Sequence, residues 1–345
     1  MGLSELIKQN EKIFKGAIDI KYYFVPSDEP IEYLLVGFSG FNGKEENGEP
    51  ARYNYVKQLK DFPCNKLFIL DDLEGNPCYY LGKNKSLEYE TTVIALITYI
   101  ANKYNISMKK IIAFGTSKGG TSALYFTMKY RFGHVIAGGM QTKVGDYLYK
   151  ISNYTRNKLL TTITGETPEY GRDYLNSFYS NIFDYPHQDI EYNIHGGSGD
   201  YHYLTYVKPF LENLKKLNIY CNVDIAEYSD HGEIGTYFTK FLFEQITRIT
   251  GKVIIKENSL KKDNNKLIVS CKVSEHLKKD KSMRYAFYFL KDKDIQPVEK
   301  IPYSHSTFAS FTPQEEGNYR VRIYAKNANG ITKVTTKSVF FSKVV

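Results

Sequence analysis

The residues with the clearest chemical potential lie in the short segment Gly115-Thr116-Ser117-Lys118-Gly119. The segment matches the pattern G-x-S-x-G, and a buried-strand pattern at 110–114 precedes it while a helical pattern at 121–130 follows it. A tight strand-to-helix turn holds its serine in a strained backbone, so the flanking residues must be small. Such a turn would present the Ser117 hydroxyl at the carboxyl end of a sheet, where it could act as a nucleophile.

A serine hydroxyl is a poor nucleophile without a base, and His231 is the histidine best placed to supply one. It follows a strand pattern at 219–227 and precedes a helical pattern at 233–249. Enzymes with this kind of serine turn carry the acid and then the histidine after later strands, in that chain order. The other histidines are less well placed and suit structural or site-lining roles: His134, His187, His195, His202, His276 and His305.

The acid that orients the histidine is expected after the strand pattern at 190–194. The glycine-rich loop 195–200 contains one carboxylate, Asp200, which would fix the imidazole tautomer and stabilise the imidazolium. Asp230 is a rival, but a residue adjacent to His231 in sequence cannot easily reach the Nδ1 atom of that ring. We therefore predict that Ser117, Asp200 and His231 form a catalytic triad.

An acyl-transfer site also needs two N–H donors for the developing oxyanion. The backbone N–H of Lys118 is one candidate, because the N-terminus of a helix offers free N–H groups and positive dipole. The loop 37–43, Gly-Phe-Ser-Gly-Phe-Asn-Gly, would supply the second donor, with the N–H of Phe41 as the candidate and its neighbours left open. The Lys118 side chain is expected either to attract an anionic substrate or to point to solvent.

Other site chemistries lack their motifs. HxxxH and HExxH are absent, and His195, Asp200 and His202 form only a loose cluster, so no metal is expected. Neither a Walker loop nor a dinucleotide fingerprint is present, so no cofactor is expected, and no RNP, helix-turn-helix or zinc pattern supports nucleic-acid binding. The four cysteines form no CxxC pair and favour a reducing cytoplasm: Cys64, Cys78, Cys221 and Cys271.

The elements that must position these residues alternate between strand and helix patterns from about residue 17 to 250. Strand patterns at 18–25 and 33–37, with a turn signal between them, indicate a first strand pair. Further strands are expected at 67–70, 110–114, 135–139, 190–194 and 219–227. A helix after Ser86 and others near 121–130, 203–217 and 233–249 separate these strands. This alternation predicts an α/β fold with a mostly parallel sheet flanked by helices.

The segment at about 141–189 is expected to form a helical cap over one end of the sheet. It is rich in aromatic residues, including Tyr147, Tyr149, Tyr154, Tyr170, Tyr174, Phe178 and Tyr179. Exposed tyrosines with polar neighbours suit stacking on sugars better than contact with lipid.

After Gly251 the sequence alternates apolar and polar residues with a period of two. Strand patterns at 253–255, 266–273, 284–290, 318–324 and 332–341 predict a small all-β, immunoglobulin-like sandwich. We therefore predict two domains, 1–250 and 251–345, in keeping with the length of 345 residues.

The charge of the chain is concentrated in the second of these domains. The chain has 46 Lys and Arg residues, of which 19 lie in residues 251–345, and 38 Asp and Glu residues, of which 9 lie there. The net charge is therefore +10 for residues 251–345 and −2 for residues 1–250. Such an excess is compatible with an anionic partner, namely a polyanionic glycan, a membrane surface or a nucleic acid, and equally with an ordinary solvated surface that has no partner.

The overall composition excludes two broad classes. With 42% hydrophobic and 24% charged residues, the chain is not expected to be mainly disordered. No apolar run reaches the roughly 18 residues of a transmembrane helix, and residues 1–16 lack the continuous apolar segment of a signal peptide.

Over about residues 17–249 the sequence resembles the α/β-hydrolase fold family. The residues that carry the resemblance are the segment 115–120, the Gly-Ser-Gly-Asp run that ends at Asp200, and the Asp-His-Gly run around His231. Within that family it is similar to bacterial serine hydrolases related to the accessory Sec system O-acetyltransferases, which act on glycans of surface glycoproteins, and to capsule-associated relatives. Residues 284–289 and 317–330 resemble the three-tyrosine β-sandwich module.

The resemblance implies a serine esterase or O-acetyltransferase that acts on acetylated sugars or on surface or capsular glycan. An alternative is a non-catalytic glycan-binding or assembly protein that keeps the hydrolase scaffold. Under either interpretation, the basic C-terminal domain could bind a polyanionic glycan at a surface separate from the serine site.

Overall fold

The computed structural model describes residues 3–28, 31–44, 47–152, 156–273, 275–328 and 330–343, so Tyr154 lies outside the described residues. The chain divides into two compact units, Met1–Leu242 and Phe243–Val345, and each is described by itself. The division falls within helix α10 (Ile234–Thr250), whereas the change of sequence pattern placed it directly after that helix.

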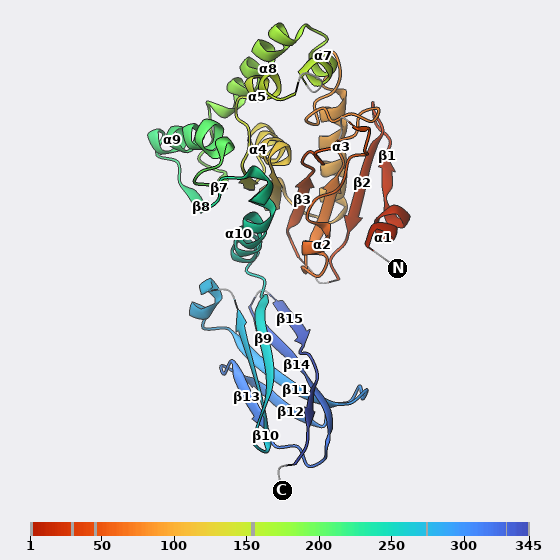
Figure 1. The fold of residues 1–345 in the computed structure, drawn as a ribbon, viewed down its shortest axis with the longest axis vertical. Coiled ribbons are helices and arrows are strands. Elements are labelled where there is room, and N and C mark those ends of the chain that lie inside the picture. The colour runs from red at the N-terminus through yellow and green to blue at the C-terminus, as the bar shows by residue number, and fades with distance from the viewer. Residues whose placement is uncertain are drawn as a thin grey trace. The chain divides into compact units, whose positions relative to one another are not determined.

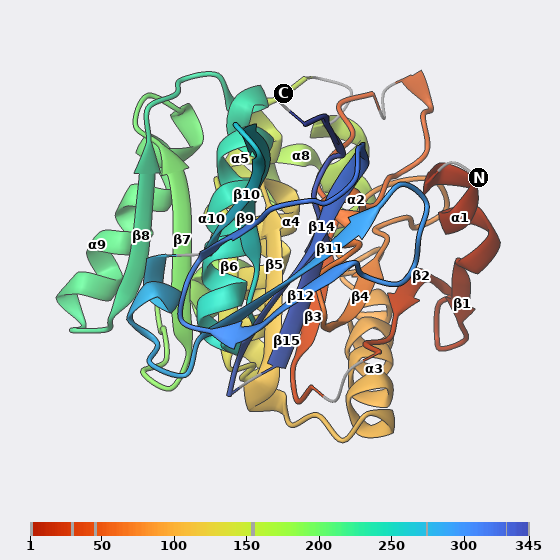
Figure 2. The ribbon, with the colours of Figure 1, turned by 90° about the horizontal axis from the view of Figure 1, so that it is seen from below.

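An eight-stranded sheet is the centre of the N-terminal unit, and its strands can be followed across Figure 2 in the order β1-β2-β4-β3-β5-β6-β7-β8. The strands are β1 (Lys12–Phe14), β2 (Ile20–Val25), β3 (Leu34–Phe38), β4 (Asn65–Ile69), β5 (Ile111–Thr116), β6 (His134–Gly138), β7 (Glu191–Gly197) and β8 (Cys221–Ala226). The six strands from β4 to β8 in this order are parallel, while β1 and β2 are antiparallel to their neighbours. The prediction of a mostly parallel sheet is confirmed.

The expected pairing of the first two predicted strands is wrong, because β4 lies between β2 and β3. Tyr22 of β2 pairs with Ile69, and Val36 of β3 pairs with Leu67. All five residues of β4 are buried, and a buried strand needs hydrogen-bond partners on both edges. The parallel pairing of β3 with β4 brings the loops that follow both strands to the same end of the sheet.

Helices connect the strands and cover the sheet. Their bounds are α1 (Leu3–Asn10), α2 (Val56–Leu59), α3 (Glu88–Lys103), α4 (Lys118–Tyr130), α5 (Val144–Lys150), α7 (Thr161–Thr164), α8 (Pro168–Phe183), α9 (Lys208–Lys216) and α10. Short 3₁₀ turns occur at η2 (Met108–Lys110), η5 (His231–Glu233) and η6 (Glu275–Lys279), and π-helical turns at η3 (Arg156–Leu160) and η4 (Tyr203–Val207). The Ser86 hydroxyl accepts a hydrogen bond from the N–H of Glu88 at the start of α3 (3.3 Å), although the N-cap position itself is Leu87.

A buried carboxylate joins α3 to α4. Glu90 accepts hydrogen bonds from the hydroxyls of Tyr125 (3.1 Å) and Tyr130 (2.5 Å), and Lys129 lies 2.6 Å from it. These partners keep the charge of Glu90 compensated inside the core.

The segment 141–189 forms α5, η3, α7 and α8, which lie together beyond one end of the sheet (Figure 1). Its aromatic residues divide into two groups. Tyr179 is fully buried with its ring 5.4 Å from that of Tyr125, whereas Tyr170 is 72% exposed. Part of the aromatic content of this segment therefore builds the core rather than an exposed surface.

The C-terminal unit contains two antiparallel sheets around one hydrophobic core, as the period-two pattern predicted. Their strands are β9 (Ile255–Asp263), β10 (Lys266–Val273), β11 (Arg284–Lys291), β12 (Glu299–Ser304), β13 (Phe308–Phe311), β14 (Gly317–Asn327), β15 (Gly330–Thr335) and β16 (Val339–Phe341). One sheet has the order β13-β10-β9 and the other β12-β11-β14-β15, with β16 also paired to β14. Across the described parts of both units, every helix is too short or too polar to cross a bilayer.

Candidate active site

Ser117 occupies the turn between β5 and α4 with φ 54° and ψ −126°, a backbone conformation that residues with a side chain rarely adopt. Its N–H donates to the carbonyl of Gly138 at the end of β6 (2.8 Å). A Cβ atom on Gly115 would lie 2.5 Å from the backbone of Gly119, and one on Gly119 would lie 2.3 Å from the carbonyl oxygen of Phe38. The small residues of the motif are therefore required by close backbone packing.

Asp200 and His231 are in direct contact. The Nδ1 atom of His231, at the start of η5, lies 2.8 Å from Oδ2 of Asp200, which is almost fully buried at the turn after β7. The Cε1 atom of His231 lies 3.0 Å from the position that a Cβ atom on Gly139 would occupy. Gly139 directly follows Gly138, whose carbonyl accepts the Ser117 N–H. Its Nε2 atom is buried and has no hydrogen-bond partner among the described residues. This nitrogen is free to accept a proton.

Asp230, the rival acid, does not reach the His231 ring by any hydrogen bond or ion pair of the described residues. Its Oδ1 atom accepts the N–H of Gly232 (2.9 Å) and caps η5 instead.

His202 is a further histidine at this position. The backbone N–H of His202 donates to Oδ1 of Asp200 (2.9 Å). The ring Nδ1 lies 3.3 Å from the same oxygen but is not aligned for a hydrogen bond. The centroid of the His202 ring is 3.6 Å from that of the His231 ring. Burial opposes ionisation of Asp200, but the imidazoles of His202 and His231 outweigh it and hold the pKa of Asp200 well below its usual range. Burial lowers the pKa of His202, which favours its neutral form. Sequence reasoning placed His202 only among possible site-lining residues.

Asp200, His202 and His231 are also the group that could hold a metal ion, because one ligand atom of each lies within 4.8 Å of the others. His195, which the sequence grouped with Asp200 and His202, faces elsewhere. Its Nδ1 lies 2.7 Å from Asp224, and its Nε2 lies 3.2 Å from the Tyr228 hydroxyl. His195 and Tyr228 are buried while the Asp224 side chain is 46% exposed, and the three residues join β7, β8 and the segment that leads to His231.

Gln141 contacts Ser117 and was missed by the sequence analysis. It is fully buried two residues beyond Gly139, and its Nε2 donates to the Ser117 Oγ atom (2.9 Å). Its Oε1 faces the hydroxyls of Thr121 (3.0 Å) and Tyr79 (3.5 Å), so the hydrogen-bond network assigns the amide nitrogen to Ser117. No local motif signals this contact, because the two residues are 24 positions apart.

The loop after β3 lies beside the serine turn. A Cβ on Gly40 would be 3.5 Å from the carbonyl oxygen of Thr116. The N–H of Ser39 donates to the Tyr80 hydroxyl (2.6 Å) and that of Gly40 to Oδ1 of Asn54 (2.7 Å), whereas the N–H of Phe41 has no acceptor in the described part of the chain. Of these three N–H groups, that of Phe41 is therefore the one without an acceptor among the described residues.

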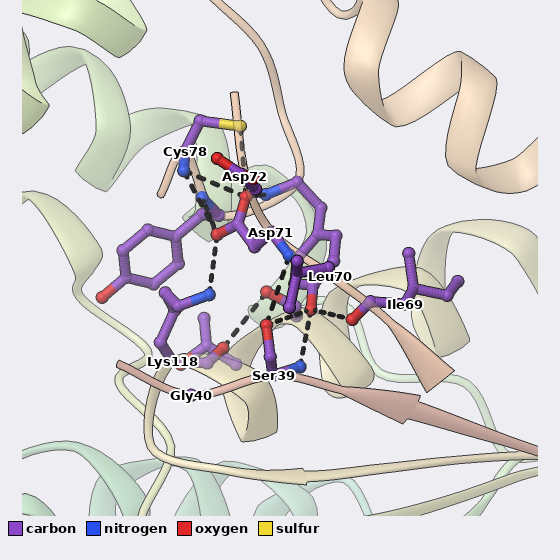
Figure 3. Close-up of polar contacts among 12 residues, drawn as sticks. Ser39, Gly40, Ile69, Leu70, Asp71, Asp72, Cys78 and Lys118 are labelled. Atoms are coloured by element: carbon purple, nitrogen blue, oxygen red, sulfur yellow. Dashed lines mark hydrogen bonds and ion pairs between the residues drawn. The ribbon is translucent and has the colours of Figure 1, made fainter. Parts of the chain in front are cut away.

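The Lys118 side chain neither points to solvent nor faces a substrate, so both expectations for it are wrong. It is 1% exposed, and its Nζ atom lies 2.7 Å from Oδ2 of Asp71 (Figure 3). Phe41 and Tyr80 present their rings to the same ammonium group, at 5.5 and 5.0 Å from the ring centroids. The residue next to the nucleophile therefore contributes an internal ion pair.

Asp71 accepts hydrogen bonds from a second segment as well. Its carboxylate receives the N–H groups of Cys78, Tyr79 and Tyr80 at 3.0–3.3 Å (Figure 3). The Tyr80 hydroxyl in turn accepts the N–H of Ser39 and donates to the carbonyl of Ile69 (2.9 Å). One buried carboxylate thus connects the start of α4, the segment 78–80 and the loop after β3.

Replacement of Lys118 by Met is expected to destabilise the fold by roughly 3–5 kcal/mol, because the Asp71 carboxylate would keep its N–H partners but lose its counter-ion. Urea unfolding followed by circular dichroism measures the loss. Lys57→Met, at an exposed position on α2, is the matched control and should change stability by less than about 0.5 kcal/mol. Equal stability of the two variants would contradict the buried ion pair.

No family profile and no curated protein matches the sequence. Among solved structures, the capsule O-acetyltransferase of Neisseria meningitidis serogroup A gives a TM-score of 0.57 at 20% identity, over 69% of this chain and 94% of that one. A histidine-to-alanine mutant of that enzyme in complex with CoA gives a TM-score of 0.56 at 19% identity, over 68% of this chain and 93% of the mutant chain. The Glycosylation Associate Protein (Gap123) complex from Streptococcus agalactiae gives a TM-score of 0.56 at 19% identity, over 69% of this chain and 46% of the matched chain. These likenesses concern the fold, and the chain has an α/β-hydrolase-like fold.

Proposed function

We propose that this chain is a serine acyl hydrolase or O-acyltransferase that forms an acyl-enzyme on Ser117 and acts on acetylated sugars or on surface or capsular glycan. The observation that carries the proposal is the strained Ser117 turn, at the sheet end where the Asp200–His231 pair also lies. A left-handed serine between a buried strand and a helix costs stability, and such strain is retained where it serves function.

The proposed reaction begins when Nε2 of His231 accepts the Ser117 proton and Oγ attacks the acyl carbonyl carbon. The N–H groups of Phe41 and Lys118 stabilise the oxyanion of the tetrahedral intermediate. As the intermediate collapses, the bond to the leaving oxygen or sulfur breaks and His231 returns the proton to that atom. Water or a sugar hydroxyl then attacks the acyl-serine by the same steps in reverse, with Asp200 holding the imidazolium throughout.

The glycan substrate is supported by the surroundings of His231 and by the fold neighbours. Tyr147 of α5 lies 5.2 Å from the His202 ring, and Tyr201, beside Asp200, is 50% exposed, so aromatic and polar groups gather near the acid. One neighbour is a capsule O-acetyltransferase, and its mutant was solved with CoA, which makes a CoA thioester an acyl donor to test.

A second candidate is a non-catalytic assembly protein on the same scaffold. Two observations favour it: the Ser117 hydroxyl bonds to Gln141, and one fold neighbour is a glycosylation-associated complex. Covalent labelling of Ser117 separates the two candidates.

Ser117→Ala is expected to abolish labelling by a fluorophosphonate and hydrolysis of p-nitrophenyl acetate, while its circular dichroism spectrum is unchanged. Asp200→Asn should lower kcat by about 10⁴-fold, because the imidazole loses the acid that fixes its tautomer. Asp230→Asn is the matched control and should lower kcat less than about 10-fold. Absence of labelling in the wild-type protein would favour the assembly protein, and the reverse ranking of the two Asn variants would move the acid to Asp230.

Gln141→Leu is expected to lower the rate of fluorophosphonate labelling by about 10-fold, the equivalent of one neutral hydrogen bond that positions the hydroxyl. Gln141→Glu should lower it further at neutral pH, because a carboxylate would accept a hydrogen bond from the Ser117 hydroxyl and so hold it away from His231. That deficit should shrink as the pH falls, since a protonated carboxyl can donate again. Gln58→Leu on the exposed face of α2 is the control. A Gln141→Leu rate equal to the wild-type rate would contradict the positioning role.

Acetyl donors are expected to react faster than octanoyl donors, as esters and as CoA thioesters, because aromatic and polar groups near His231 suit a small acyl group on a sugar. Mass spectrometry of an acidic polysaccharide incubated with each donor measures transfer, and release of free acid measures hydrolysis. Ser117→Ala provides the background for both. Faster turnover of octanoyl than acetyl esters would contradict a glycan-directed site.

A further inference from the structure

The outward side of the larger sheet in the C-terminal unit gathers cations and tyrosines. Alternate residues of β11 and β14, among them Phe287 and Ile323, point into the hydrophobic core, so the residues between them point outward. Strand register places residues of β12 and β15 beside them. We call this surface the basic sheet face and define it by Arg284, Tyr288, Lys300, Arg322, Tyr324, Lys326 and Lys333.

Cations surround the two tyrosines of the basic sheet face. Tyr288 pairs in register with Lys300 on one side and Arg322 on the other, and the Lys300 Nζ atom lies 5.7 Å from its ring centroid. Tyr324 pairs with Lys333, and the two tyrosine rings are 4.9 Å apart and tilted by 58°. Aromatic and cationic groups therefore alternate on this face.

The charge of this face is not compensated across the strands. β11, β14 and β15 contain no Asp or Glu, and the one acid of β12, Glu299, pairs with the core residue Phe289 and so lies on the other side. Arg284 stands directly opposite Lys326, and like charges at opposed positions destabilise a sheet. Arg284 donates to the carbonyls of Lys281 and Met283, and Lys326 lies 4.1 Å from the ring centroid of Tyr303, but no acid of these strands neutralises either charge.

The other sheet of the same unit shows the opposite arrangement. Lys272 forms an ion pair with Glu257 on the neighbouring strand (2.7 Å), and Lys266 stands opposite Asp263. The basic sheet face therefore differs from the other sheet in that its cations have no acid beside them on the neighbouring strands.

We propose that the basic sheet face binds an acidic polysaccharide. This proposal rests on the proposed function in one respect only, namely that the bound polysaccharide would be the acyl acceptor. Cations spaced along and across the strands match the repeated carboxylates of such a polymer, and tyrosine rings pack on the C–H faces of sugars. The 58° tilt between the rings does not form the parallel platform on which successive nucleic-acid bases stack.

The test measures binding of the full chain to fluorescent polygalacturonate by anisotropy. The double variant Arg322→Glu/Lys333→Glu should weaken binding by about 10-fold or more and reduce its salt dependence, because two attractive contacts become repulsive. Lys261→Glu/Lys266→Glu makes the same change of net charge on the outward side of the other sheet and should weaken binding less than about 3-fold. Thermal unfolding of both variants checks that the unit stays folded.

Equal weakening by the two double variants would overturn the proposal, because binding would then follow net charge alone. It would also be overturned if neutral dextran bound as tightly as polygalacturonate, or if single-stranded oligo-dT or phosphatidylserine vesicles bound more tightly at equal salt. Fluorophosphonate labelling of Ser117 in the same samples reports the proposed function separately. Loss of labelling with intact polymer binding, or the converse, shows which of the two proposals has failed.

Discussion

The buried ion pair between Asp71 and Lys118 is the interaction on which the candidate site depends. Lys118 is the first residue of α4, so its side chain fixes the start of the helix directly after Ser117. Asp71 receives three backbone N–H groups of the segment 78–80, and Tyr80 holds Ser39 in the loop that offers the Phe41 N–H. Such a network stabilises only when all its members are present, since each lost partner leaves a buried group unpaired. Ser117 and the two N–H groups proposed as oxyanion donors thus share one electrostatic support.

Backbone packing supplies the second constraint. Ser117 has a positive φ of 54° in a turn where the backbone packs closely, since a Cβ atom on Gly115, Gly119 or Gly120 would lie only 2.3–2.9 Å from backbone atoms. On the opposite side, His195 bonds to Asp224 and Tyr228 and joins the strand ends that precede Asp200 and His231. The strained serine and the Asp200–His231 pair are therefore carried by rigid strand ends, which suits a site that must be preorganised.

The sequence predicted the parts that depend on local patterns and missed those that depend on distant pairing. Strand and helix positions followed from periodicity, and the parallel sheet from their alternation. The insertion of β4 between β2 and β3 was missed, because a turn signal between two strands does not reveal a later strand that separates them. Lys118 was misjudged because a lysine is nearly always exposed unless a buried acid pairs with it, and Asp71 is 47 residues away. Gln141 went unnoticed for the same reason, while the triad stays a prediction from motif and chain order.

In the proposed mechanism, the choice between hydrolysis and transfer depends on which hydroxyl reaches Nε2 of His231 once the acyl-serine has formed. That nitrogen is buried although 28% of the His231 side chain is exposed, so an acceptor must enter a confined position to lose its proton there. Water can always do so, and a sugar hydroxyl competes only if it is oriented or held at high local concentration. Retention of a polymer by a second surface of the same chain raises that concentration without any new contact at the serine. An uncompensated cationic face outside the hydrolase-like unit is consistent with this way of favouring transfer over hydrolysis.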